Sequence, residues 1–384
     1  MGRAGGGTGP PADSVAPPAA AGRGTGSPSR VRDCKDGEVL SDVHLLHEPC
    51  ASFTTTSFII RMGYGDDVEH SMRHAQEPCF DADGDCVVRR RASRRRGELV
   101  VRHLCETPLA GVGMQVWRGA LLLADYLLHR PDILRQATVL ELGCGCALTG
   151  LLAGRFASRV VLTDAPLGIL ANARHNIALN VGTLQAIVDV RHLDWFHFDP
   201  LIDGLEREQL RRSSHQDELE VVRVDEPTSN DIPIGHTCDE RFKEADVFEN
   251  ASCDPYGWQA EHRAYEFTRP DLLHVARTTV VLAADVIYDC AATEAFVTLL
   301  SALLPRLPAA QAFISLERRI NFHLPSLTPR ATAADHFAAL LSKSRRLHAE
   351  KIKVADVPTC FEYERVAQLE LWRVVAVSTS SKVP

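Results

Sequence analysis

The chain has 384 residues, of which 45% are hydrophobic, and a net charge of -8 at neutral pH. This is enough to bury one large core or two modest ones, and the negative charge argues against a protein that coats nucleic acid. No apolar run approaches the roughly 18 residues that a membrane helix needs, and the N-terminus lacks the pattern of a signal peptide. We therefore expect an intracellular protein without direct contacts to membrane or nucleic acid.

The 11 cysteines do not follow a metal-binding or disulfide pattern. In an intracellular protein they are expected to be reduced thiols. No two of them have C-x-x-C spacing, which argues against a disulfide framework and against a zinc site built from ligand pairs. Cys144 and Cys146 lie close together, but no second pair of ligands stands near them in the sequence. We expect no metal site.

The N-terminal region, residues 1–97, differs in composition from the rest of the chain. Its first 30 residues are mostly Gly, Pro, Ala and Ser, which predicts disorder because little apolar surface is available for burial. The region is mixed from 39 to 86, with an apolar patch at 58–60. Six arginines follow within residues 89–96. That basic run fits a solvated linker or a nuclear-import or acidic-partner patch, and nothing local decides between the two.

From residue 98 onward the sequence predicts a globular α/β domain that extends to about residue 375, followed by a tail at 376–384. In chain order we expect a strand at 98–105, a helix at 116–128, a strand at 138–142, a helix at 148–156, a strand at 159–163, a helix at 167–179, strands at 186–192 and 278–284, a helix at 292–304, and strands at 310–316 and 368–375. Continuous apolar strands that alternate with helices are typical of a parallel sheet covered on both faces. The last strand is expected to run antiparallel to its neighbour.

An acidic insertion, residues 201–260, interrupts this alternation. Its first 50 residues, 201–250, contain 14 Asp or Glu and 6 Lys or Arg, a difference of -8. A polar segment of this length between two strands is usually disordered or loosely packed. Attraction of a basic substrate segment is the functional alternative.

The stretch 139–150 reads as a strand, a turn with Gly143 and Gly145, and a helix. Such a turn is typical of nucleotide-binding folds. The dinucleotide fingerprint would need glycine where Leu148 stands, and the chain has no phosphate-binding loop of the NTPase type. Asp164 ends the next strand, where an acid can bind two ribose hydroxyls. From the residues alone, a turn or helix-capping role would explain Asp164 equally well.

Five motifs in sequence order resemble the class I, seven-strand S-adenosylmethionine-dependent methyltransferases of family 16. The motifs lie at residues 113–127, 141–145, 176–180, 193–195 and 284–288. The second resembles E/D-x-G-x-G-x-G, with Ala147 in place of the third glycine, and the last fits D-x-x-Y at the end of the fourth strand. The resemblance implies a Rossmann-like sheet of seven mostly parallel strands with helices on both faces, and S-adenosylmethionine as cofactor.

The resemblance also implies which residues bind this cofactor. The backbone at 143–145 would pass beside its methionine part, where a Cβ would collide with the ligand. Asp164 would bind the ribose, Trp195 with Asp194 beside it would contact the adenine, and Trp117 would close the pocket. The extra methyl of Ala147 is expected to affect cofactor affinity. The implied cofactor-binding residues are Trp117, Glu141, Gly143, Cys144, Gly145, Asp164, Trp195 and Ala284.

Asp285 and Tyr288 are the catalytic residues that the resemblance implies. A lysine acceptor has a pKa of about 10.4 and must lose its proton before it attacks, and alignment of the reacting atoms supplies most of the acceleration. A carboxylate and a phenol at a strand end would position this amine. We expect Asp285→Ala to abolish methyl transfer and to leave cofactor binding nearly intact.

The resulting interpretation is a protein-lysine N-methyltransferase, monomeric, located in the nucleus or cytoplasm. The resemblance suggests a nuclear, nucleic-acid-binding protein as the substrate. One alternative is a catalytically idle cofactor-binding interaction protein, which would not need Asp285 and Tyr288. Another is a methyltransferase of small molecules or nucleic acids. The N/D-P-P-Y motif of nucleic-acid enzymes is absent, since residues 253–256 lack its second proline and precede the strand at 278–284.

Overall fold

The computed structural model describes residues 38–40, 53–60, 97–214, 262–307, 309–323 and 328–377. Several expectations lie outside these residues: the disorder of residues 1–30, the nature of the basic run 89–96, the turn at 253–256 and the tail beyond 377. The acidic insertion is described only as far as residue 214. No helix in the described ranges is long and apolar enough to cross a membrane.

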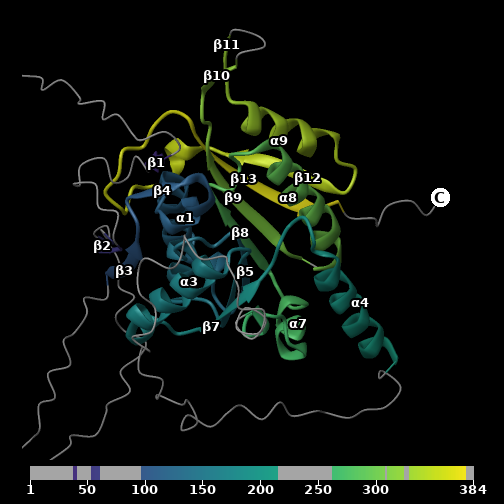
Figure 1. The fold of residues 1–384 in the computed structure, drawn as a ribbon. Coiled ribbons are helices and arrows are strands. Elements are labelled where there is room, and N and C mark those ends of the chain that lie inside the picture. Colours follow the sequence, from purple (N-terminus) through teal and green to yellow (C-terminus); the bar gives the residue numbers. More distant parts are fainter. Residues whose placement is uncertain are drawn as a thin grey trace, which may run out of the picture. The chain divides into compact units, whose positions relative to one another are not determined.

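A seven-stranded sheet forms the centre of the fold (Figure 1). In spatial order its strands are β12 (Leu347–Ile352), β13 (Leu369–Ala376), β9 (Gln311–Glu317), β8 (Val280–Ala284), β5 (Thr138–Leu142), β6 (Arg159–Asp164) and β7 (Ile187–His192). The strands from β9 to β7 are parallel. Only β13 runs against its neighbours. The mostly parallel Rossmann-like sheet and the antiparallel last strand are therefore confirmed.

Helices cover both faces of this sheet. On one face lie α1 (Arg118–His129), α2 (Leu148–Ala153) and α3 (Leu167–Asn180), and on the other α4 (Asp199–Ser214), α7 (Arg269–Val275), α8 (Cys290–Leu303) and α9 (Thr332–Lys343). In β8, Val280 and Leu282 enter the first core, whereas Val281 and Ala283 enter the second. Because successive side chains of a strand point to opposite faces, each central strand must be apolar throughout.

The chain order of the strands fixes where a ligand binds. From β5 the chain proceeds outward through β6 to β7, and then returns to β8 on the other side of β5 and continues to β9. Loops after β5 and β8 therefore diverge at the carboxyl edge of the sheet. Open α/β sheets bind ligands in the crevice at such a switch point.

A two-stranded ribbon, β2 (Thr54–Ile59) with β3 (Glu98–His103), lies outside the main sheet. Phe58 and Ile60 are buried in the core that contains α1, so this part of the N-terminal region is folded, contrary to the expectation of a largely disordered segment. The apolar patch at 58–60 supplies these buried side chains, although the composition of the region as a whole predicted disorder. Four further short strands form two antiparallel pairs: β1 (Glu38–Leu40) pairs with β4 (Glu106–Pro108), and β10 (Asn321–His323) pairs with β11 (Thr328–Arg330).

Asparagine side chains of α3 bind the backbone of β3. Asn180 accepts from the N–H of Val100 and donates to its C=O, and Asn176 does the same with Arg102, at 2.6–3.0 Å. Asn172 also donates to the C=O of Arg102. Residues four apart share one helix face, so the asparagines supply to β3 the hydrogen bonds of a neighbouring strand. The motif at 176–180 is therefore structural.

The start of the acidic insertion also differs from expectation. Helix α4 begins at Asp199, and Leu201, Ile202 and Leu205 are buried against the sheet. Glu208 is buried as well and pairs with Arg211 and Arg269. The high charge of residues 201–250 concealed this amphipathic helix, because its apolar positions are few and closely spaced.

Candidate active site

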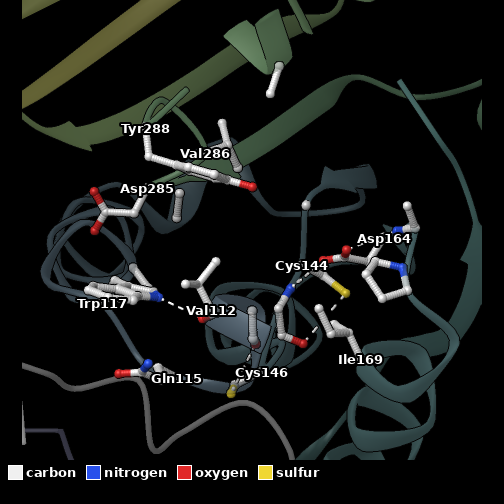
Figure 2. Close-up of a pocket in the computed structure, with 18 of the residues that line it drawn as sticks. Val112, Gln115, Trp117, Cys144, Cys146, Asp164, Ile169, Asp285, Val286 and Tyr288 are labelled. Carbon is white, nitrogen blue, oxygen red and sulfur yellow. Dashed lines mark hydrogen bonds between the residues drawn. The ribbon is translucent and has the colours of Figure 1, made fainter. Parts of the chain in front are cut away.

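A pocket of about 300 Å³ lies at the carboxyl ends of β5, β6 and β8 (Figure 2). All ten residues that the sequence assigned to cofactor binding or catalysis line it. They come from the start of α1, the turn after β5, the end of β6, the segment after β7 and the segment after β8. They are Trp117, Glu141, Gly143, Cys144, Gly145, Asp164, Trp195, Ala284, Asp285 and Tyr288.

The turn between β5 and α2 requires its glycines for reasons internal to the protein. Gly143 has a φ of 72° and Gly145 a φ of 51°, both in the left-handed region that favours glycine. A Cβ on Gly143 would lie 2.8 Å from the side chain of Val286, and one on Gly145 would lie 2.9 Å from the carbonyl oxygen of Gly113. Collision with a ligand is therefore not needed to explain either glycine.

Ala147 is in the left-handed region as well, with a φ of 62°. It is fully buried and immediately precedes α2. An alanine in this conformation costs roughly 1–2 kcal/mol, so a glycine here, as in the family motif, would be relaxed. Ala147 is not among the residues that line the pocket. The departure from the motif therefore affects the turn rather than the ligand surface.

Asp164 joins the end of β6 to this turn. One carboxylate oxygen accepts a hydrogen bond from the N–H of Gly145 and the other from the N–H of Ala165, each at 2.9 Å. Burial raises the pKa of this carboxyl, and the two amides oppose that rise. Each oxygen can accept a further hydrogen bond, and Asp164 lines the pocket, so the carboxylate could accept from two hydroxyls.

Glu141 lies beneath the turn, and only 2% of it is exposed. Its Oε2 has no hydrogen-bond partner in the described part of the protein. Burial raises the pKa of this carboxyl well above its usual range, and the nearby charge of Asp164 adds to the rise. A buried polar atom in a pocket wall without a partner is the place where a ligand or an ordered water would supply one.

The two cysteines of the turn are poor nucleophiles and poor metal ligands. Burial and the charge of Asp164 raise the pKa of both thiols well above the usual range, so the reactive thiolate is disfavoured. Cys146 donates toward the carbonyl oxygen of Gly113. In the described ranges no group of three or more His, Cys, Asp or Glu could hold a metal ion.

Trp195 and Asp194 line the pocket near the Asp164 end of the turn. Trp195 packs on Phe296 of α8 with ring centroids 5.1 Å apart, and its ring edge lies close to Gly143. Asp194 accepts from the N–H of Phe196 and pairs with His197, which fixes the loop. A flat base bound here would meet an aromatic ring and a hydrogen-bond acceptor.

Trp117 stands at the opposite end of the pocket, directly before α1. Its indole N–H donates to the carbonyl oxygen of Val112 at 2.9 Å, and the guanidinium of Arg319 lies over its ring at 4.3 Å. Arg118, the first residue of α1, is buried and pairs with Glu317 and Glu364. The start of α1 is thereby fixed to the end of β9.

Asp285 fixes the same two elements. It follows β8 with a φ of 54°, and its oxygens accept from the backbone N–H groups of Gly119 at 2.5 Å and Glu317 at 2.8 Å. A Cβ on Gly119 would lie 2.5 Å from the carboxylate, so only glycine fits there. Burial raises the pKa of Asp285, and the charge of Arg319 and the two amides oppose that rise.

Tyr288 is the exposed member of the D-x-x-Y motif, with 44% of its surface accessible. Figure 2 shows it on the same side of the pocket as Asp285 and Val286, across from Cys146 and Trp117. Its hydroxyl has no hydrogen-bond partner within the described ranges. Burial of the ring and the charges of Asp164 and Asp289 raise the pKa of this phenol, so it stays protonated at neutral pH.

Two residues of the site, Gly119 and Arg319, escaped the sequence analysis. Gly119 lies inside the motif at 113–127, but its need for a missing side chain depends on Asp285, 166 positions away. Arg319 follows β9, the strand next to β8, and lines the pocket. The rule that the carboxyl ends of parallel strands share one edge could have identified it.

The pocket fits S-adenosylmethionine in the chemistry of its walls. It offers a carboxylate to the ribose, an aromatic ring to the base, an unpartnered buried oxygen at Glu141, and a turn with glycines at positions 143 and 145. When bound, this cofactor supplies a methyl group on a positively charged sulfur. The residues that would hold it are those of the turn, Asp164, Trp195 and Trp117.

Comparisons with known proteins agree with this fit. The family model described as lysine methyltransferase matches residues 101–208. Methyltransferase-like protein 22 is 35% identical in Mus musculus and 34% in Homo sapiens, over 72% of this chain and 58% and 57% of those proteins. The chain thus spans a little more than half the length of these relatives. Histone-arginine methyltransferase METTL23 of Rattus norvegicus is 43% identical over 54 residues, which are 14% of this chain and 24% of that protein.

A solved structure was also found, the O-methyltransferase TomG of Streptomyces achromogenes in complex with SAM. It has 14% identity and a TM-score of 0.32 over 66% of this chain and 79% of that one. Residues 101–208 are therefore similar to the lysine methyltransferase family, and 72% of the chain is similar to methyltransferase-like proteins, in agreement with the chemistry of the pocket.

Proposed function

We propose that this protein transfers a methyl group from S-adenosylmethionine to a lysine side chain of a protein substrate. Support comes from the description of the matching family as lysine methyltransferase. The observation that carries the proposal is Tyr288, a phenol at the pocket wall, partly exposed and without a hydrogen-bond partner in the described part of the chain. A group with these properties is available to an incoming amine.

Alignment is the main contribution of the protein to such a reaction. The amine must be neutral and must direct its lone pair along the line of the bond that breaks. The hydroxyl oxygen of Tyr288 would accept one N–H of this amine, which leaves the nitrogen lone pair free. Because the phenol is protonated, it does not stabilise the ammonium form as a phenolate would.

Asp285 acts in this proposal as a positioning residue. Its two backbone hydrogen bonds hold the start of α1, with Trp117 beside it, against the ends of β8 and β9. The direct lysine contact that the family resemblance implied stays a prediction.

The test is transfer of tritiated methyl groups from the cofactor to proteins of a cell extract, with identification of the labelled protein and amino acid. Tyr288→Phe should reduce transfer about 10- to 100-fold and leave cofactor affinity within about twofold. Tyr126→Phe, at the far end of α1 in a separate cavity, is the matched control and should be fully active. Full activity of Tyr288→Phe would contradict the role of the phenol.

Arginine is the second candidate acceptor, because one relative is named a histone-arginine methyltransferase. The same labelled product decides between the two, since hydrolysis and mass spectrometry separate methyl-lysine from methyl-arginine. Label in nucleic acid or small molecules would support the other enzyme classes. Cofactor binding without any labelled product would support an idle interaction protein.

We also propose a nuclear or cytoplasmic location, a monomeric state and a nuclear, nucleic-acid-binding substrate. The arginine run at 89–96 is the feature that favours nuclear import. A fluorescent fusion in which these six arginines are replaced by glutamine should lose nuclear accumulation. Light scattering measures the mass in solution, and a dimer would contradict the monomer.

A further inference from the structure

The charges around the pocket are strongly unequal. Among the described residues that line it, Glu141, Asp164, Asp194 and Asp285 are acids, and Arg319 is the only basic side chain. A ligand that carries both signs of charge would therefore find several places for its positive groups and a single place for a negative one. That single place is at the Trp117 end of the pocket.

Arg319 is positioned but not paired. Its guanidinium lies 4.3 Å from the centroid of the Trp117 ring, and no described residue forms a hydrogen bond or ion pair with it. Neighbouring acids are already engaged, because Glu317 pairs with Arg118 and both oxygens of Asp285 accept backbone amides. A guanidinium stacked on an aromatic face keeps its N–H edges free for bidentate binding of a carboxylate.

The charge of Arg319 acts on the part of the pocket where the methyl group would be transferred. It lowers the pKa of both Asp285 and Tyr288, against the larger effect of burial on each. The guanidinium is therefore electrostatically close to both groups of the D-x-x-Y motif, although no ion pair with Asp285 forms. Its position over the Trp117 ring places it at the end of the pocket away from Asp164 (Figure 2).

S-adenosylmethionine has one negative group, the carboxylate of its amino-acid part. If its ribose binds Asp164, its amino-acid part would extend toward Trp117. We propose that Arg319 binds the carboxylate of the cofactor and thereby fixes the amino-acid end against Trp117. The proposal rests on the cofactor and the family, and it is independent of which acceptor is methylated.

The test compares two ligands that differ in this group. S-adenosylhomocysteine has the amino-acid part, and 5′-methylthioadenosine lacks it but shares the adenosine. Calorimetric titration of the full chain without any acceptor gives both dissociation constants. Arg319→Gln should weaken binding of S-adenosylhomocysteine about 10- to 100-fold and change that of 5′-methylthioadenosine by no more than about twofold. Arg319→Lys, which retains the charge but not the fork, should lie between.

Arg318→Gln is the matched control. This neighbouring arginine pairs with Asp335 and Glu370 and does not line the pocket, so both ligands should bind normally. Equal weakening of both ligands by Arg319→Gln would show that Arg319 only supports Trp117, and would overturn the proposal. Unchanged binding of S-adenosylhomocysteine would overturn it too and would leave Arg319 to an acidic group of the substrate. Failure of the wild type to bind either ligand would instead refute the cofactor assignment.

Discussion

Two aspartates of this protein end parallel strands of one sheet, and each accepts two backbone hydrogen bonds. Asp164 after β6 binds the N–H groups of Gly145 and Ala165, both within or beside the glycine turn. Asp285 after β8 binds those of Gly119 and Glu317, which belong to α1 and β9. The first therefore organises one local turn, whereas the second connects three separate parts of the chain.

Asp164 and Asp285 lie at similar positions, at the carboxyl ends of two strands, but we expect them to have different roles. Asp164 lines the pocket and binds only its own turn, so we expect its carboxylate to act mainly in ligand binding. Asp285 is a structural contact, because its hydrogen bonds fix the start of α1 and the end of β9, and only 8% of it is exposed. Substitution of Asp285 should therefore affect mainly the stability of the protein, and substitution of Asp164 should affect mainly its affinity for the ligand.

Asp285→Ala should have the largest effect of these variants, and this effect should be on stability. A stability equal to that of the wild type would contradict the comparison. Two backbone N–H groups would lose their acceptor, each at about 1–3 kcal/mol, so we expect the free energy of unfolding to fall by about 2–6 kcal/mol. Urea denaturation measures this. We also expect cofactor affinity to fall, since Trp117 adjoins the loosened start of α1. This replaces the expectation from sequence that binding stays nearly intact.

Gly119→Ala is the complementary variant. It leaves Asp285 in place but puts a methyl group where the carboxylate now lies, so the contact between Asp285 and the start of α1 should be lost. Similar losses in the two variants would support the role of the contact. A free energy of unfolding equal to that of the wild type in both variants would show that Asp285 does not stabilise the fold.

Asp164→Asn should have the second largest effect, and on the other property. The amide side chain keeps one acceptor for the turn, but its NH2 group replaces the oxygen that accepts the other backbone N–H, and the negative charge is lost. We expect the dissociation constant of S-adenosylhomocysteine to rise about 10- to 100-fold, and the free energy of unfolding to fall by about 1–3 kcal/mol, less than in Asp285→Ala. A loss of stability as large as that of Asp285→Ala would remove the distinction between the two aspartates.

A third acid, Glu141, sharpens the comparison through pH. Its pKa is raised by burial, so its contribution to stability is present at low pH and is lost as pH rises above the usual range of a glutamate. Glu141→Gln should therefore gain stability relative to the wild type between pH 5 and pH 8, by less than Asp285→Ala loses. Denaturation without cofactor at both values tests this, and a difference independent of pH would refute it.

Ala147→Gly should have the smallest effect. Relief of the left-handed alanine is offset by the lost methyl burial and by the greater freedom of the unfolded chain, so we expect a change in unfolding free energy within about 1 kcal/mol. Cofactor affinity should stay within about twofold, because Ala147 does not line the pocket. A large change in affinity would show that the turn transmits the strain to the ligand surface.

Much of the fold was predictable because its signals are local. Each strand and helix expected from residue 98 onward is present, since a sheet buried on both faces leaves continuous apolar runs. The contact between Asp285 and the start of α1 was not predictable in this way, because it depends on the space left by Gly119, which is far from Asp285 in the sequence. Helix α4 was missed for another reason, since its charged residues outnumber the few that enter the core.

The asparagines of α3 have a consequence for how ligand binding can be observed. Asn176 binds β3 and also donates to the carbonyl oxygen of Cys146 in the glycine turn, at 3.0 Å. The backbone N–H of Arg102 therefore donates to a side chain whose order depends on that turn. Amide hydrogen exchange at this position of the ribbon should slow when the cofactor binds, although Arg102 does not line the pocket, and would serve as a remote reporter of occupancy.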